Sequence, residues 1–110
     1  LTNSAGIHAV PMAEHVVGGV IYLLRGFDRA VDLHRAGRWD KAPWTGEGAD
    51  VREVGEQRVL VVGAGGIGGA IGGRLAALGA TVTGIRRNPD RGVPPGFAAV
   101  HPPEALDALL

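Results

Sequence analysis

The chain has 110 residues, enough for one small domain, and its 45% hydrophobic and 20% charged content is that of an ordinary globular protein. Eleven basic residues balance eleven acidic ones, so a formal net charge of zero gives no general attraction to nucleic acid or to an anionic membrane. The absence of cysteine excludes a disulfide framework, a thiolate metal site and a thiol nucleophile.

The amino-terminal residues do not have the pattern of a secretory signal. No basic region precedes an apolar run there, and the apolar run from Val16 to Leu24 is far shorter than the roughly 20 residues that a bilayer requires. We therefore expect a cytoplasmic protein with neither a membrane nor a nucleic acid as partner. Because the sequence starts on Leu1 and ends on Leu110, inside an apolar helical pattern, we also expect a piece of a longer protein.

The first predicted element is a long helix within residues 1–37. Pro11 suits a first helical position and Gly37 a left-handed end, which gives a span of about 26 residues and roughly 39 Å. Such a helix is too long to bury its apolar face on a small sheet, so we expect it to pack on a second domain or a second subunit, with an ordinary core helix as the alternative. Its apolar residues recur every three or four positions: Val17, Val20, Ile21, Leu24, Phe27 and Val31.

Residues 38–57 are predicted to form a connecting loop. The segment is rich in Gly, Pro, Asp and Glu, which favour turns over regular elements. Trp39 and Trp44 are expected to pin this loop onto a surface, so neither is assigned a chemical role.

The pattern of residues 58–110 predicts the first half of a dinucleotide-binding domain. The β-branched run 58–62 indicates a strand covered on both faces, a helical pattern from Ile67 to Leu78 ends at Gly79, and residues 81–85 form a second strand. A third strand is predicted at 97–100, and Pro103 can open a last helix. We therefore expect a partial Rossmann fold, an α/β doubly wound parallel sheet of strand order 3-2-1, whose first strand is an open edge that favours self-association.

A glycine-rich turn joins the first predicted strand to its helix. The pattern Gly-x-Gly-x-x-Gly is a weak signal in a chain with 19 glycines, but here it follows an apolar strand, opens a helix and precedes a second strand. Gly63 permits the tight turn, Gly65 lets a pyrophosphate approach the backbone, and Gly68 lets the helix lie close to the strand. The first helical amides then face the phosphates, and a merely connecting turn is the alternative. The predicted binding residues are Gly63, Ala64, Gly65, Gly66, Ile67 and Gly68.

The residues after the second predicted strand indicate which cofactor is taken. Folds that take NAD usually place an acid there to bind the ribose hydroxyls, whereas this chain has Arg86 and Arg87. A charge-assisted contact from each guanidinium to the 2′-phosphate of NADP would be worth roughly 1.5 to 3 kcal/mol. Asp90 follows too late to replace the missing acid. We predict NADP, with NAD as the second choice and a solvated basic rim as the alternative reading.

Several motifs in a fixed order resemble one family. They are residues Thr2–His8, Pro11–His15 and Gly37–Trp39, followed by the glycine turn with Ile67. Together they resemble the D-isomer-specific 2-hydroxyacid dehydrogenases over nearly the whole chain, and the match looks closest to glyoxylate/hydroxypyruvate reductase-like members with Arg after the second strand. The resemblance implies an oxidoreductase of EC 1.1.1 type that transfers a hydride between NADPH and a small 2-oxo acid, giving a D-2-hydroxy acid.

The resemblance also implies what this chain contributes. In the family the cofactor lies in the cleft of a two-domain protein, the long helix contributes to a homodimer, and the segment Val10–Met12 approaches the nicotinamide. The family's catalytic Arg, Glu and His lie beyond the matched region, and Arg74, His101 and Glu104 do not match their motifs. We therefore assign no catalytic residue and expect this piece to be inactive alone.

Other chemistries find no support in the sequence. Ser4 lacks a nucleophile elbow and Glu14-His15 lacks a second helical histidine, so hydrolase and metalloprotease readings fail. No metal site is predicted, because the histidines show no ligand spacing: His8, His15, His34 and His101. Two alternatives stay open, a non-catalytic nicotinamide-nucleotide sensor or interaction protein of the same fold, and a Rossmann enzyme of another reaction type.

Overall fold

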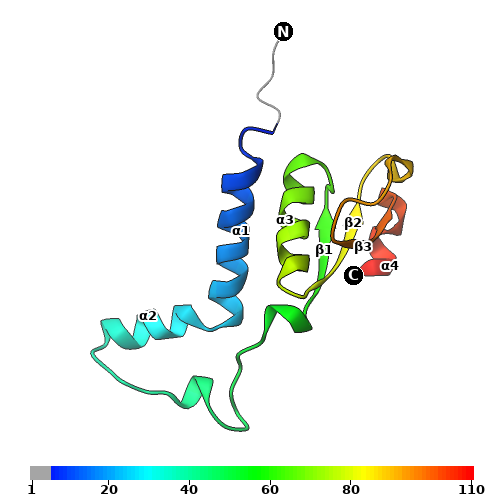
Figure 1. Ribbon diagram of the computed structural model, residues 1–110. Helices are drawn as coiled ribbons and strands as arrows, with labels where there is room; N and C mark the ends of the chain where they lie inside the picture. The colour runs from blue at the N-terminus through cyan, green and yellow to red at the C-terminus, as the bar shows by residue number, and fades with distance from the viewer. Residues whose placement is uncertain (1–5) are drawn as a thin grey trace.

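The computed structural model describes residues 6–110, so the Thr2–Ala5 part of the resemblance lies outside the described residues. Figure 1 shows two amino-terminal helices beside a small α/β unit. The helices and strands are α1 (Ala9–Leu24), α2 (Phe27–Arg35), β1 (Arg58–Val62), α3 (Gly66–Ala77), β2 (Thr81–Ile85), β3 (Phe97–His101) and α4 (Leu106–Leu109).

The sheet has three parallel strands in the order β1-β2-β3. β1 pairs with β2 from Arg58 opposite Thr81 to Val62 opposite Ile85, and β2 pairs with β3 with one irregularity between Val82 and Thr83. This is strand order 3-2-1, so the predicted partial Rossmann fold is confirmed. Because all three strands run the same way, their carboxyl ends meet at one edge of the sheet, where α/β folds bind their ligands.

The core lies between the sheet and α3. Its buried side chains come from α3, from β2, from the start of β3 and from the turns on either side of α3, and α1 packs on α3 from outside (Figure 1). Figure 1 also shows α4 on the opposite side of the sheet. The buried members of the core are Ala64, Leu75, Ala80, Val82 and Phe97.

Phe97 explains two of the many glycines. A Cβ atom added at Gly72 would lie 2.2 Å from the ring carbon Cζ of Phe97, and one added at Gly84 would lie 3.0 Å from its Cε1. The aromatic ring therefore fills the space that side chains on α3 and β2 would otherwise take. This close packing supplies a structural reason for glycine within a helix, where it costs about 1 kcal/mol relative to alanine.

The prediction of a single helix from Pro11 to Gly37 is wrong, because the chain bends between α1 and α2. Gly26 adopts a left-handed conformation with φ 64° and ψ 34°, which ends the first helix and begins the second. Glycine takes this conformation without the steric cost that other residues meet. The apolar spacing of three residues from Leu24 to Phe27 continues across the bend, so periodicity alone gives no sign of the break.

The bend is fixed by the loop that follows α2. The indole Nε1 of Trp44 donates to the carbonyl of Arg25 at 2.8 Å, and the amide of Arg52 donates to the carbonyl of Leu24 at 2.9 Å. Arg29 on α2 also pairs with Asp50, with 3.1 Å between Nη2 and Oδ2. The pinning role predicted for Trp44 is confirmed.

Trp39 does not pin the loop, because 94% of its surface is exposed, contrary to expectation. It belongs to a projection that we call the arm, made of α2 and residues 36–53 (Figure 1). The accessible surface of 7713 Å² reflects this open shape, since a compact monomer of similar mass exposes roughly 5,700 Å². Within residues 6–110, no helix has the length and hydrophobicity needed to cross a membrane.

Candidate functional site

The glycine turn lies at the carboxyl ends of the strands and is tied to its neighbour there. Gly63 follows β1 with φ 98°, a value that glycine adopts freely. The amides of Gly63 and Ala64 both donate to the carbonyl of Ile85, at 2.8 and 2.9 Å. These two bonds hold the turn against the end of β2 and fix the direction in which α3 begins.

The turn leaves a row of backbone donors that have no acceptor within the helix. Gly65 is the N-cap of α3, and its carbonyl receives the first helical hydrogen bond from the amide of Gly69 at 2.6 Å. The amides of Gly66, Ile67 and Gly68 precede that bond, so helix geometry gives them no partner. Together with the positive end of the helix dipole, three such donors form a site suited to an anion such as a phosphate.

The three glycines of the motif have separate structural reasons. Gly63 needs its positive φ, whereas a Cβ at Gly68 would lie 2.2 Å from the carbonyl oxygen of Gly63 and 3.0 Å from Cγ1 of Val61. A Cβ at Gly65 would meet nothing within 4 Å. The space beside Gly65 is therefore open, and only a ligand in that space would require glycine there.

The two residues of the turn that carry side chains, Ala64 and Ile67, lie on opposite sides of it. Ala64 is buried in the core, and its methyl group packs against Gly84 of β2. Ile67 is partly exposed at the first turn of α3. Ala64 therefore shapes the turn from behind, and Ile67 lies at its outer surface.

A cavity of about 360 Å³ lies beside the glycine turn, and we call it the turn cavity. One side comes from the end of β1 and the turn, the second from the residues that end and follow β2, and the third from the segment after β3. Residues of the first two sides were predicted from the sequence, whereas Pro103 and Leu106 on the third side were not. The lining residues are Val62, Gly63, Gly65, Ile85, Arg86, Arg87, Pro103 and Leu106.

The predicted arginines both line the turn cavity, but their side chains are placed differently. Arg86 is half buried, and its Nη2 donates to the carbonyls of Pro89 and Gly92. Arg87 is exposed, and its side chain has no hydrogen bond or ion pair with any described residue. The structure therefore brings both arginines to the glycine turn, with one guanidinium engaged and one available.

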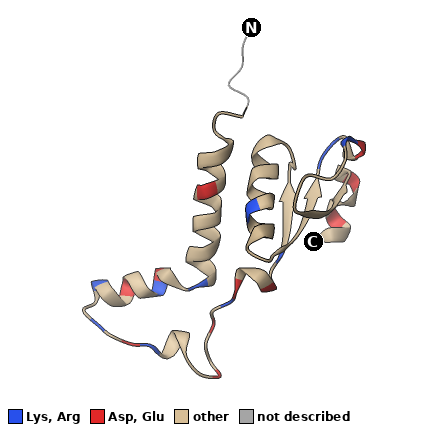
Figure 2. Cartoon of the chain, in the orientation of Figure 1, with Lys and Arg blue, Asp and Glu red and all other residues tan. Residues whose placement is uncertain are grey.

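Charge around the site favours an anionic ligand. The sequence contains no Asp or Glu between Gln57 and Asp90, a stretch that includes the whole βαβ unit. Figure 2 shows the glycine turn free of charged residues and the basic segment after β2 beside it. No carboxylate of the βαβ unit would therefore repel a phosphate bound at the turn.

The first turns of α1 and α3 lie at the same end of the molecule (Figure 1). Val10 and Met12, in the segment expected near a nicotinamide, are about half exposed on α1. Ala13, directly after them, is fully buried. This placement puts the segment on the side of the fold that carries the glycine turn.

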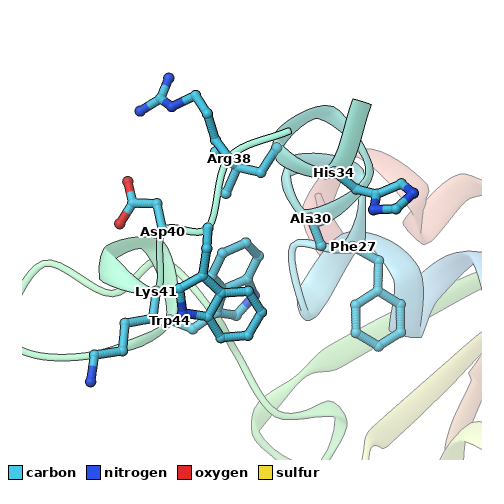
Figure 3. Close-up of a pocket in the computed structure, with 9 residues that line it drawn as sticks. Phe27, Ala30, His34, Arg38, Asp40, Lys41 and Trp44 are labelled. Carbon is cyan, nitrogen blue, oxygen red and sulfur yellow. The ribbon is translucent and has the colours of Figure 1, made fainter. Parts of the chain in front are cut away.

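A second cavity, of about 440 Å³, lies in the arm and is separate from the glycine turn. Figure 3 shows the rings of Phe27 and Trp44 at this cavity, with the charged ends of Arg38 and Lys41 directed away from it. The arm cavity is thus apolar and offers no converging reactive groups. In residues 6–110, no group of three or more potential metal ligands comes together.

Comparison with known proteins identifies the domain. Residues 17–109 match the family described as the NAD binding domain of D-isomer specific 2-hydroxyacid dehydrogenases. A family protein from Xanthobacter autotrophicus, solved in complex with NADPH and MES, is 30% identical with a TM-score of 0.69, over 90% of this chain and 37% of that one.

Two further structures show the same fold. A family protein from Aeromonas salmonicida has a TM-score of 0.76 at 22% identity, over 99% of this chain and 31% of that one. An NADPH-dependent glyoxylate/hydroxypyruvate reductase from Sinorhizobium meliloti has a TM-score of 0.75 at 23% identity, over 100% of this chain and 31% of that one. The chain thus spans about a third of the length of these structures.

Proposed function

The chain belongs to the D-isomer specific 2-hydroxyacid dehydrogenase family, as part of the NAD-binding domain, and from this membership we propose that it holds the cofactor of a hydride-transferring oxidoreductase. The reaction proposed for the intact protein is transfer of a hydride from NADPH to the carbonyl carbon of a small 2-oxo acid such as glyoxylate or hydroxypyruvate. A proton adds to the carbonyl oxygen, which gives a D-2-hydroxy acid and NADP⁺. The family is one of nicotinamide-dependent enzymes, so the cofactor class follows from membership. The substrate and the direction of the reaction are proposals that go beyond family membership.

The cofactor pyrophosphate is proposed to bind at the start of α3. The observation that carries this proposal is the row of amides at Gly66, Ile67 and Gly68, which have no backbone acceptor within residues 6–110, next to open space beside Gly65. Amides of this kind bind phosphate oxygens through hydrogen bonds that the helix dipole reinforces. No residue of the turn has to move for this contact, because the donors are backbone groups fixed by the bonds to Ile85.

NADP is proposed as the preferred nucleotide, with the basic residues after β2 as the reason. Arg86 and Arg87 occupy the wall of the turn cavity where an NAD-binding fold places an acid. Relatives of this chain include a structure with NADPH and a formate dehydrogenase from Staphylococcus aureus with NAD. In this chain, Arg86 and Arg87 are thus proposed to determine the preference for NADP over NAD.

Nucleotide titration and turnover of the intact protein test this function together. We expect NADPH to bind at least tenfold more tightly than NADH, because one charge-assisted hydrogen bond is worth about 1.5 kcal/mol or more. Glyoxylate or hydroxypyruvate should then support oxidation of NADPH, followed by the loss of its absorbance. Tight NADPH binding without turnover on any 2-oxo acid would instead indicate a nucleotide sensor, and equal affinity for both nucleotides would contradict the assignment of NADP.

A homodimer is proposed as the working assembly, with the arm as the contact. Side chains of α1 and the arm expose apolar surface that no other described residue covers, including Leu23, Phe27 and Trp39. An exposed apolar surface of this kind commonly marks a subunit interface. Light scattering should give the mass of a dimer, and Trp39→Ser should shift the mass toward that of a monomer. A monomeric wild-type protein would contradict the proposal.

A further inference from the structure

We propose that the two arginines after β2 have different tasks. Arg86 is a positioning residue that fixes the segment 88–92 along the turn cavity, and Arg87 alone contacts the 2′-phosphate of the nucleotide. This inference rests on the proposed function, in which Arg86 and Arg87 together give the preference for NADPH over NADH. Here each arginine is given its own part in that preference.

Arg86 is held at both its backbone and its side chain. Its amide donates to the carbonyl of His101 at 3.0 Å, which extends the pairing of β2 with β3 by one bond. Its Nη2 lies 3.4 Å from the carbonyl oxygen of Pro89 and also donates to the carbonyl of Gly92. The Nε atom is buried and has no partner among the described residues. The guanidinium is therefore part of the cavity wall rather than a group that projects into solvent.

The segment 88–92 has little else to hold it. It contains a single short 3-10 turn, Pro89–Arg91, and Gly92 follows with φ 91°. Proline has no amide hydrogen to donate, and the backbone hydrogen bond inside the segment is a long one, 3.4 Å from the amide of Arg91 to the carbonyl of Asn88. One guanidinium that bonds the carbonyls of Pro89 and Gly92 ties the two ends of this turn to the end of β2.

The side chain of Arg87 differs from that of Arg86 in exposure and in hydrogen bonding. Its side chain is exposed and makes no hydrogen bond or ion pair within residues 6–110, although it lines the same cavity. A guanidinium whose donors already bond carbonyls must give up those bonds to clasp a phosphate, whereas a free one needs only to rotate. Arg87 is thus the side chain that can reach the 2′-phosphate while the wall stays intact.

The two tasks predict different effects on the two nucleotides. Loss of the hydrogen bonds from Arg86 to segment 88–92 should disturb the part of the turn cavity that faces the adenosine. NADPH and NADH share the adenosine, so both should bind more weakly. Loss of the phosphate contact should affect NADPH alone, because NADH carries no 2′-phosphate. The ratio of the two dissociation constants therefore separates positioning from contact.

The experiment measures the Kd of NADPH and of NADH for the intact protein by calorimetry, with Arg86→Met and Arg87→Met as a matched pair. Arg87→Met should raise the Kd of NADPH tenfold or more and leave that of NADH unchanged. Arg86→Met should raise both values several-fold by the same factor, so that their ratio stays at the wild-type value. A collapse of the ratio in Arg86→Met, or no change in either Kd, would overturn the assignment.

Two further measurements keep the proposal testable if Arg86→Met perturbs the fold. Arg86→Lys retains the charge but reaches fewer carbonyls, so it should weaken both nucleotides alike, whereas selective recovery of NADPH binding would place Arg86 on the phosphate. Hydrogen exchange of the cofactor-free protein should show faster exchange of the Arg91 amide in Arg86→Met than in Arg87→Met. If the wild type binds neither nucleotide, the proposed function fails, and the exchange comparison still decides whether Arg86 braces the segment.

Discussion

Gly65 and Gly68 exclude side chains for different reasons, although both belong to one motif. Gly68 is enclosed by the protein itself, because a Cβ there would lie 2.2 Å from the carbonyl oxygen of Gly63. Gly65 faces open space, and its backbone angles of φ −94° and ψ −150° need no positive φ. Substitutions at these two positions should therefore separate stability from binding.

Gly65→Leu should leave the protein folded but weaken nucleotide binding. The leucine side chain would occupy the approach to the amides of Gly66 and Ile67, and loss of even one charge-assisted hydrogen bond corresponds to about a tenfold weaker affinity. Titration with NADPH and thermal unfolding check this, with Gly69→Ala on the same helix as the control. An unchanged Kd in a folded Gly65→Leu protein would place the nucleotide elsewhere.

Gly68→Ala should instead destabilise the fold. The added methyl group meets a backbone carbonyl that cannot rotate away, so we expect the free energy of unfolding to fall by about 2 kcal/mol or more. Chemical denaturation measures this change. A Gly68→Ala protein as stable as the wild type would show that the turn is looser than the structure indicates.

The residues that sequence reasoning could place were those whose task is local. The turn, its position after a strand and the arginines beyond β2 all follow from the order of residues along the chain. The bonds from Arg86 to Pro89 and Gly92, and the contribution of Pro103 and Leu106 to the cavity, depend on how separate segments fold together. The turn sequence Asn88-Pro89 was the available signal for the first of these.

At the scale of elements, α3 approaches the sheet closely because it carries glycine where Phe97 of β3 lies. Gly72 on the inner face of the helix has no room for a Cβ, whereas the nearest neighbour of a Cβ at Gly69 would be Cβ of Pro94 at 4.0 Å. Helical glycine is therefore required at one position and only tolerated at the other.

Gly72→Ala and Gly69→Ala should have opposite effects on stability. Gly72→Ala should lower the free energy of unfolding by about 1 to 3 kcal/mol, because the ring of Phe97 must move. Gly69→Ala should raise it by roughly 0.5 to 1 kcal/mol through better helix propensity. Urea denaturation of the two variants gives the comparison, and equal effects of the same sign would contradict the packing described here.

The bend between α1 and α2 shows where periodicity fails as a predictor. A three-residue step from Leu24 to Phe27 suits one continuous helix, yet Gly26 turns the chain and Trp44 caps the carbonyl exposed by the turn. The partners that stabilise the bend lie 19 to 28 residues further along the chain, with Trp44 bonded to Arg25 and Arg52 to Leu24. The spacing of apolar residues within a helix does not reveal contacts with residues so far away in the sequence.

Trp44→Phe should loosen the arm, and Trp39→Phe should not. Phenylalanine keeps most of the ring but removes the indole donor to Arg25, which should cost roughly 0.5 to 1.5 kcal/mol. Because this donor holds the loop on the bend, limited proteolysis of residues 36–53 should become faster in Trp44→Phe than in Trp39→Phe. Equal cleavage rates would mean that the hydrogen bond does not secure the loop.

For the whole molecule, the confirmed parts are the fold class, the strand order and the family. The βαβ unit could be predicted because each of its elements has a strong local pattern and its connections are short. The projecting arm could not, because it depends on the bend at Gly26 and on the hydrogen bond from Trp44 that holds the loop there. An accessible surface of 7713 Å² exceeds the roughly 5,700 Å² of a compact monomer of similar mass.

The most direct test of the central claim is a crystal structure of the intact protein with NADP⁺ bound. We expect the pyrophosphate oxygens within about 3.2 Å of the amide nitrogens of Gly66 and Ile67, at hydrogen-bonding distance. The 2′-phosphate should lie beside Arg87. A pyrophosphate bound away from the start of α3, with these amides facing only water, would contradict the account.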